Sequence, residues 1–377
     1  MAVILYICAA YPHARGVKWV SALRDAEFSV VVFRGGNQKG AATIWADNAD
    51  VIAVRTVNGL DTKFSFDAAI CHHIVRQAAF YEPDAILVRD IFLAGYALCA
   101  AKKLDIPCYV DLADNYPEVA KSIIGLRLGK NLGFYVLNQW EQYVLRRASG
   151  VVAVSPESKT HIMSKHGLHD SQVFVVENVP KDLKARLVSS SVFSGNLVYI
   201  GTYDRGIRDL DTVIEGLKQY HRTARESMHL TIYAFQPERL RSLLHEHGNP
   251  TEFVTVMPAV ENSTLHETLC EFDVGVVPHC RCPATEYTVP NKLYDYLYSG
   301  LRVICSDNPP FRRILKDIGG GIVYSAGDPL DFAESLRCLK VMIEERTAQI
   351  NAGRLTSKYD WNVQVESFVR HLHNTLT

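Results

Sequence analysis

The sequence predicts an α/β protein made of two successive domains, each with a parallel sheet. The chain has 377 residues, which is too long for one ordinary core and suits two. Short runs rich in β-branched residues recur along it with helical stretches between them. Continuous apolar strands of this kind are typical of parallel sheets covered on both faces. The runs form two series, and a stretch of linker composition separates them near residue 190.

The first domain is expected over residues 1–185 and the second over residues 190–358. The segment 359–377 contains "YDWNVQVESFVRHL" and predicts a C-terminal helix that packs back toward the first domain. The strands of the first domain are predicted at 3–8, 29–33, 51–56, 85–89, 108–112, 150–155 and 173–178. Those of the second are predicted at 196–201, 230–235, 253–258, 274–279, 302–307 and 321–325.

Composition and charge narrow the function classes. Hydrophobic residues make up 48% and charged residues 21%, as in soluble globular proteins. A net charge of −1 gives the protein no overall positive field that would attract nucleic acid, so no nucleic-acid partner is expected. The cysteines within strand-like runs indicate a reduced, cytoplasmic protein. Cys280 and Cys282 have no second pair at zinc-site spacing, so no metal is expected.

The ends of the predicted strands are the places to look for chemistry, because ligands of open parallel sheets bind beyond the carboxyl ends of the strands. No strand is followed by G-x-G-x-x-G, which disfavours a nicotinamide oxidoreductase. Walker, nucleophile-elbow and H-E-x-x-H patterns are absent too. The strand ends offer hydrogen-bond donors and cations instead.

Two segments of the second domain carry these donors. In "YIGTYDRGIRDL" a glycine turn after a strand is followed by Arg205 and Arg208, and guanidinium groups bind phosphate bidentately. Pairing of these arginines with Asp204 or Asp209 on the surface is an equal alternative.

In "PNKLYDYL" Lys292 stands at a helix N-terminus, where free N–H groups bind anions. Asp295 lies one turn further on the same face and suits a ribose hydroxyl, although a surface Lys–Asp pair would explain both residues. Together the two segments predict a site for a nucleoside diphosphate.

These residues lead to a family. The segments "YIGTYDRG" and "PNKLYDYLYSGLRVI" resemble motifs of the retaining glycosyltransferases of family four. The segments "GVVAVSPESKTHIMSKHG", "VFVVENVP" and "EFDVGVVPH" are similar to further parts of that family, in the same order. The resemblance implies the GT-B fold, in which two Rossmann-like domains face each other across an interdomain cleft.

The resemblance also implies an activity. The protein would transfer a hexose from a UDP- or GDP-type sugar donor to an acceptor hydroxyl, in polysaccharide or glycolipid biosynthesis, without a cofactor. The acceptor would be a glycan or a lipid-linked molecule. A nucleotide-sugar epimerase or hydrolase of the same fold, or a non-catalytic partner subunit, is the alternative.

Matching the family's motifs to this sequence assigns site residues and also shows where the sequence differs from the motifs. Asp295 stands where the family has its second glutamate, whereas Tyr287 stands at the first and Glu286 lies one residue early. Thr202 takes the place of the usual arginine of the basic pair, and Arg205 takes that of the lysine. The residues expected to bind the donor are Gly201, Thr202, Arg205, Asn291, Lys292 and Asp295, with Glu286 near the sugar.

The first domain is expected to bind the acceptor. "CYVDLADNYPE" places Asp111 and Asp114 after a strand, and Asp114 takes the acidic place of a family element near the sugar. Asp114 could instead cap the next helix. The loop after the first strand adds His13, Arg15 and Gly16 as substrate-binding candidates. Asp114, Lys292 and Arg205 are the expected catalytic residues, and Asp90, at the end of "ILVRD", is a weaker candidate than Asp114.

The segment 121–147 mixes large apolar residues with lysines and arginines. Such a segment suits the surface of an anionic membrane, and a lipid-linked acceptor would explain it. The protein would then work at the inner face of the cell membrane. An ordinary covering helix with basic ends is an equal alternative.

Overall fold

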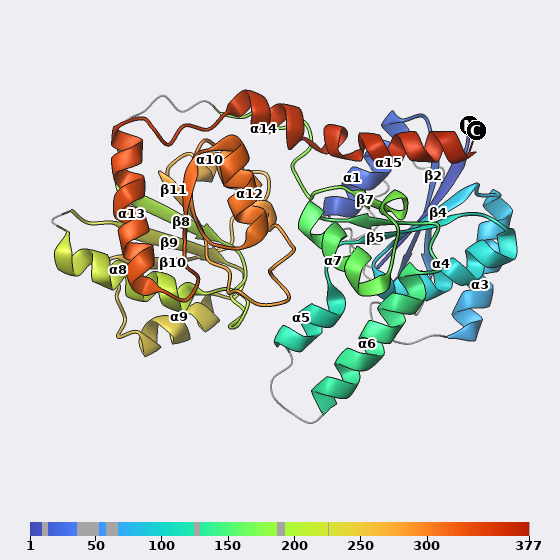
Figure 1. Cartoon of the computed structure of the whole chain (residues 1–377), viewed down its shortest axis with the longest axis horizontal. Helices are drawn as coiled ribbons and strands as arrows, with labels where there is room; N and C mark the ends of the chain where they lie inside the picture. The colour runs from blue at the N-terminus through green and yellow to red at the C-terminus, as the bar shows by residue number, and fades with distance from the viewer. Residues whose placement is uncertain are drawn as a thin grey trace. The chain divides into compact units, whose positions relative to one another are not determined.

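The computed structural model describes residues 1–9, 14–35, 53–57, 67–123, 129–186, 193–224 and 226–376 (Figure 1). The chain divides into two compact units, as shown by the way its residues cluster. The first unit comprises Met1–Lys121, Leu126–Lys181 and Trp361–Thr377, and the second comprises Ser122–Gly125 and Asp182–Asp360. His13, residues 187–192 of the predicted linker and residues 124–128 of the 121–147 segment lie outside the described residues.

The first unit is built on a seven-stranded parallel sheet with the order β3-β2-β1-β4-β5-β6-β7. Its strands are β1 Val3–Cys8, β2 Ser29–Gly35, β3 Ala53–Val57, β4 Ala85–Arg89, β5 Cys108–Leu112, β6 Gly150–Ala153 and β7 Val173–Val175. Its helices are α1 Ala14–Asp25, α3 Ala68–Tyr81, α4 Ile91–Leu104, α5 Tyr116–Ile123, α6 Gly129–Leu145, α7 Pro156–His166 and α15 Trp361–Leu376, with a short 3-10 turn at Asp170–Gln172.

The second unit is built on a six-stranded parallel sheet with the order β10-β9-β8-β11-β12-β13. Its strands are β8 Asn196–Ile200, β9 His229–Ala234, β10 Val254–Pro258, β11 Val274–Val277, β12 Arg302–Ser306 and β13 Gly321–Tyr324. Its helices are α8 Leu210–Thr223, α9 Pro237–Glu246, α10 Leu265–Leu269, α11 Asn291–Tyr298, α12 Pro309–Ile318, α13 Pro329–Glu344 and α14 Ala352–Lys358. The predicted fold class, two α/β units with parallel sheets, is confirmed.

Local chemistry explains where a predicted strand is shorter than expected. The run 150–155 is a strand only as far as Ala153, because Ser155 caps the next helix. Its hydroxyl oxygen accepts a hydrogen bond of 2.9 Å from the backbone N–H of Ser158. Pro156 then occupies the first position of α7, where a missing N–H costs no hydrogen bond.

The C-terminal helix α15 completes the first unit, and Figure 1 shows it beside α1. The indole Nε1–H of Trp361 donates a hydrogen bond of 3.0 Å to the carbonyl oxygen of Lys18. The rings of Trp361 and Trp19 meet edge to face, with centroids 5.3 Å apart, and both residues are fully buried. Phe368 packs edge to face against Trp19, Tyr109 and Phe174. The helix therefore packs beside α1 and covers the part of the first sheet formed by β5 and β7.

A disulfide joins Cys71 in α3 to Cys99 in α4. This corrects the expectation of a reduced protein for these two cysteines. The two helices pack against each other, which brings together two cysteines 28 residues apart that share no recognisable spacing motif. Among the helices of the described residues, none is both long and apolar enough to cross a membrane.

A close contact fixes α11 on the second sheet. The ring of Tyr296 lies directly on Gly275 of β11, where an added Cβ would come within 2.2 Å of a ring carbon. The Tyr296 hydroxyl oxygen accepts a hydrogen bond of 2.9 Å from the backbone N–H of Ile200 in β8. Only glycine at position 275 allows this approach, so the helix is held against two adjacent strands.

We expect Gly275→Ala to destabilise the protein by about 1–3 kcal/mol, because overpacking forces Tyr296 and α11 away from the sheet. Urea unfolding followed by circular dichroism measures the loss. Gly133→Ala is the matched control, since nothing lies within 4 Å of an added Cβ there. That change should be neutral or raise the free energy of unfolding by up to ~1 kcal/mol. Equal effects of the two substitutions would contradict the contact.

Candidate functional site

The candidate site lies at the carboxyl edge of the second sheet. The strand order changes direction between β8 and β11, and open α/β sheets bind ligands at such a switch point. Gly201 follows β8 directly, and His279 follows β11 by two residues. An isolated bridge connects the backbone of His279 to that of Arg208. The two loops that flank the switch point are therefore joined.

Lys292 reaches this edge from the first turn of α11. A Cβ added to Gly201, whose φ is +140°, would lie 2.7 Å from the Lys292 Nζ. The ammonium stands over the ring of Tyr199, 3.8 Å from its centroid. Burial, together with the charge of Arg208, lowers the pKa of Lys292 well below its usual range, and Asp295 opposes the shift. The structure thus brings together Gly201 and Lys292, which the sequence placed in separate motifs.

Arg208 is the second cation of this edge. Its guanidinium hydrogen-bonds the buried Tyr199 side chain, whose hydroxyl donates a hydrogen bond of 2.6 Å to the carbonyl oxygen of Thr202. These contacts fix the glycine turn and Arg208 relative to the Tyr199 ring, on which the Lys292 ammonium rests. The sequence prediction left Arg208 out of the site residues, although the second basic residue of "DRGIR" was a signal for it.

His279 completes the cluster and was missed by sequence reasoning. It is 2% exposed, and neither ring nitrogen has a hydrogen-bond partner among the described residues. Burial, with the charges of Arg208 and Lys292, lowers the pKa of His279 well below its usual range, so the ring is neutral at pH 7. Only the strand ending "VVPH" pointed to this position.

Arg205 lies in a different environment from the one expected. Its side chain is 60% exposed and donates hydrogen bonds of 2.9 Å to Asp211 and 2.7 Å to Glu246. These contacts raise its pKa, with Glu246 the larger influence. His247 binds the same Asp211 carboxylate at 3.2 Å. Arg205 therefore belongs to a surface network of ion pairs.

The remaining donor candidates surround α11. Asn291 is the exposed first residue of the helix, Asp295 is half-buried one turn later, and Thr202 is exposed. Glu286 is held by Arg281, with 2.9 Å between Nη2 and Oε2. Arg281 also binds Asp307, which follows β12. Glu286 therefore has a cationic partner of its own.

In the first unit Arg15 and Asp111 bind each other. Nη2 of Arg15 lies 2.7 Å from Oδ1 of Asp111, and the Trp19 indole donates a hydrogen bond of 3.0 Å to the same carboxylate. Both charged residues are at most 1% exposed, so their polar atoms hold α1 on the sheet. Gly16 lies against the Tyr6 hydroxyl, and the exposed Asp114 precedes α5.

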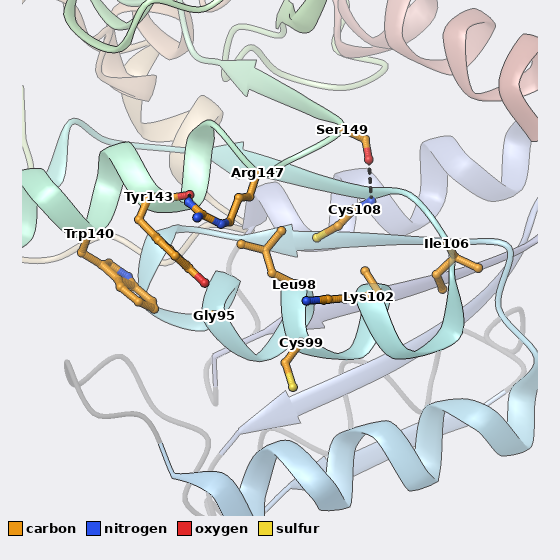
Figure 2. A pocket seen from close by; sticks show the side chains of 11 residues that line it. Gly95, Leu98, Cys99, Lys102, Ile106, Cys108, Trp140, Tyr143, Arg147 and Ser149 are labelled. Carbon is orange, nitrogen blue, oxygen red and sulfur yellow. Dashed lines mark hydrogen bonds between the residues drawn. The ribbon is translucent and has the colours of Figure 1, made fainter.

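A separate pocket of about 670 Å³ lies between α4 and α6 of the first unit, at the amino ends of β5 and β6 (Figure 2). Trp140, Tyr143 and Arg147 come from the α6 side, and Leu98 and Lys102 from α4. The pocket is mainly apolar with basic residues in its wall. It lies at the edge of the first sheet opposite the carboxyl ends of the strands. The pocket is therefore separate from the carboxyl ends of the strands, where substrate binding is expected.

Comparisons with known proteins cover both units. The model of Glycosyltransferase Family 4 matches residues 17–179, and that of Glycosyl transferases group 1 matches residues 194–340. A phosphatidyl-myo-inositol mannosyltransferase of Mycobacterium leprae is 22% identical over 237 residues, which are 62% of this chain and 60% of that protein's length.

Among solved structures, HepE of Anabaena in complex with UDP and glucose is similar, with a TM-score of 0.70. It is 13% identical, and the match covers 99% of this chain and 100% of that one. Sucrose-phosphate synthase of Thermosynechococcus elongatus has a TM-score of 0.71 at 14% identity, with 99% and 100% covered. These likenesses define the fold class as GT-B. The two matching family models, one for each unit, then identify the chain as a member of the family-four type of glycosyltransferases.

We expect Asp111→Asn to destabilise the protein by about 3–5 kcal/mol, because it leaves the buried Arg15 cation without its counter-charge. Chemical denaturation at pH 7 measures the loss. Asp114→Asn is the matched control and should stay within about 0.5 kcal/mol, since Asp114 is exposed. A loss below 1 kcal/mol for Asp111→Asn would refute the assignment.

Lys292→Met should raise the free energy of unfolding by about 0.5–2 kcal/mol at pH 7, as removal of strained site residues often does. The pKa of Lys292 is depressed in the folded state, so protonation favours the unfolded chain below pH 10.5. The gain should therefore shrink as the pH rises toward 10.5. Thermal unfolding from pH 7 to pH 10 measures it, and a gain that grows with pH would contradict the depressed pKa.

Proposed function

We propose that the protein transfers a hexose from a nucleoside-diphosphate sugar to an acceptor hydroxyl in polysaccharide or glycolipid biosynthesis. The observation that carries the proposal is the cluster of Lys292 and Arg208 around Gly201 at the switch point of the second sheet. A glycine lets a ligand approach the backbone closely, and the two cations match the charge of a diphosphate. Family membership supports the same reaction class.

The donor diphosphate would bind to Lys292, Arg208 and the free N–H groups that begin α11. Cations and a helix N-terminus stabilise negative charge that develops on a leaving group, and this is how they would assist departure of the nucleotide. Asp295 would accept hydrogen bonds from the ribose hydroxyls. Retention of configuration rests on the family resemblance alone.

Arg208 is preferred to Arg205 as the second phosphate ligand because of their partners. Arg205 is bound by two carboxylates on the surface, whereas Arg208 lies beside Lys292 and His279. The neutral, buried His279 ring would accept one hydrogen bond from the nucleotide sugar, or donate one to it, without adding charge to the site. Asn291, Thr202 and Glu286 stay as further donor-site candidates.

A uridine donor is the preferred type among the two expected, UDP and GDP. The support is that HepE, which shares the fold, was solved in complex with UDP and glucose. The acceptor would be a glycan or a lipid-linked molecule bound by the first unit, with Asp114 near the reacting hydroxyl. The name of the mannosyltransferase relative supports a glycolipid acceptor.

Contact with a membrane surface fits the same picture. Tyr135, Val136 and Tyr143 of α6 are exposed, and the Arg147 guanidinium stacks on the Tyr143 ring at 3.9 Å. Aromatic and basic groups together suit the interface of an anionic bilayer. The protein would then act at the inner face of the cell membrane, where a lipid-linked acceptor is available.

Nucleotide binding tests the donor site directly. We expect one of UDP, GDP, ADP and CDP, at a hundred times its dissociation constant, to add about 2.7 kcal/mol of stability. Thermal unfolding with this panel measures it, and UDP should give the largest shift. Lys292→Ala should remove the shift and abolish sugar transfer, because the diphosphate loses one of its two proposed cationic ligands.

Arg208→Gln and Arg205→Gln form a matched pair that discriminates between the two arginines. The first should weaken nucleotide binding at least tenfold, and the second should leave it within about twofold, since it removes only a rim charge. If Arg205→Gln weakened nucleotide binding more than Arg208→Gln, Arg205 would be the second phosphate ligand instead. Absence of any nucleotide shift in the wild-type chain would favour a non-catalytic partner subunit.

A further inference from the structure

A row of polar residues ends four adjacent strands of the first sheet. The strand register pairs Cys8 of β1 with Arg34 of β2, and Arg89 of β4 with Asp111 of β5. Ile7 pairs with Val88, so Cys8 and Arg89 are the next neighbours across β1 and β4. The order of this sheet also changes direction between β1 and β4. The row therefore crosses the switch point, where an α/β sheet binds its ligand.

The two arginines of this row are buried and incompletely bonded. Arg34 is 7% exposed and Arg89 is 8% exposed. Within the described residues, Nε and Nη1 of Arg34 and Nη1 of Arg89 have no hydrogen-bond partner. Buried guanidinium donors without acceptors are rare in folded proteins, because each unmet donor costs free energy. Something that carries acceptor atoms is expected to meet them.

The neighbouring groups that the structure describes do not supply the missing acceptor charge. Asp111 is engaged by Arg15 and by the Trp19 indole. Asp90 accepts from the backbone N–H of Phe92, and burial raises its pKa to about 6. Burial likewise raises the pKa of Cys8, whose thiol feels both Arg89 and Arg34, to about 12. The thiol is therefore neutral at pH 7, and the guanidinium groups outnumber the anions around them.

The backbone at the switch point is strained. Asp90 has φ 62° and ψ 169°, a region that residues other than glycine seldom adopt. Its N–H donates to the carbonyl oxygen of Asp111 at 3.0 Å, and its carboxylate caps α4. Such strain persists where the surroundings enforce it, and it concentrates at binding sites. It holds the first turn of α4 next to Arg89.

We propose that Arg34 and Arg89 bind a phosphate group of the acceptor, so that the protein glycosylates a phosphorylated or diphosphate-linked molecule. The inference rests on the proposed function, in which the first unit binds the acceptor. Guanidinium groups bind phosphate oxygens in pairs of parallel hydrogen bonds, and two buried arginines match a doubly charged group. This site is distinct from the donor diphosphate site, which belongs to the second unit.

Thermal unfolding with pyrophosphate tests the site. The full chain carries Lys292→Ala in all samples, so that the donor site does not respond, and chloride at equal ionic strength is the reference. We expect pyrophosphate to raise the Tm of this chain. Added Arg34→Gln or Arg89→Gln should weaken the apparent affinity at least tenfold, while the exposed Arg76→Gln should change it less than twofold. No shift, or a shift that survives both substitutions, overturns the proposal.

Two further measurements keep the result interpretable. Arg34→Gln and Arg89→Gln with Lys292 intact should retain the nucleotide-dependent Tm shift, which shows that the variants fold and that the donor site is whole. Arg89→Lys should retain part of the pyrophosphate response, because it keeps the charge and loses the fork of donors. A nucleotide response without a pyrophosphate response refutes this inference and leaves the proposed function standing. A pyrophosphate response without any nucleotide response refutes the proposed function and the acceptor role, not the anion site.

The source of the phosphate is resolved with two probes, glucose 1-phosphate in solution and farnesyl diphosphate in detergent micelles. Stabilisation by both, lost in Arg34→Gln, means that the phosphate itself is recognised. Stabilisation by farnesyl diphosphate alone, lost in the same variant, supports a lipid-linked acceptor. Stabilisation by neither overturns the acceptor assignment.

Discussion

The contact between Tyr296 and Gly275 is the constraint on which the candidate site at the carboxyl edge of the second sheet depends. One side chain ties α11 to β11 through packing and to β8 through a hydrogen bond with Ile200. Lys292 lies four residues earlier on the same helix, so its ammonium is carried to Gly201 by a rigid element. A site supported in this way keeps its geometry better than one built on loops alone. The packing of an apolar ring thus decides the position of a charge.

The protein contains two kinds of buried or partly buried cation, which differ in how their charge is compensated. The charge of Arg15 is balanced by Asp111 and holds a helix on its sheet, while its Nη1 also lacks a hydrogen-bond partner among the described residues. Lys292 has a depressed pKa beside Arg208, and Arg34 and Arg89 keep unmet donors in the part of the chain that the structure describes. The first kind stabilises the fold, and the second kind comprises the cations that we propose bind anions. Both sheets place the second kind at the point where the strand order reverses.

Short apolar runs were sufficient to predict the two parallel sheets, because strands such as β4 and β11 are continuous apolar segments buried along their whole length. The motif order also placed Gly201 and Lys292 at one site. The choice between Arg205 and Arg208 lay beyond the sequence, since Glu246, 41 residues away, determines which arginine is held at the surface. In the sequence Arg34 only follows one predicted strand and Arg89 ends another, and their burial depends on neighbouring strands β1 and β5. Long-range packing of this kind leaves no local pattern.

The return of α15 to the first unit has a consequence for biosynthesis. Trp19, Tyr109 and Phe174 belong to the early part of the chain, yet the aromatic residues that cover them come from residues 361–376. The ribosome must first add the whole of Asp182–Asp360, which takes roughly 10–40 s at ordinary elongation rates. During that interval the part of the first sheet that α15 covers stays open as a hydrophobic surface. Nascent chains of this protein are therefore natural clients for chaperones that shield aromatic patches until translation ends.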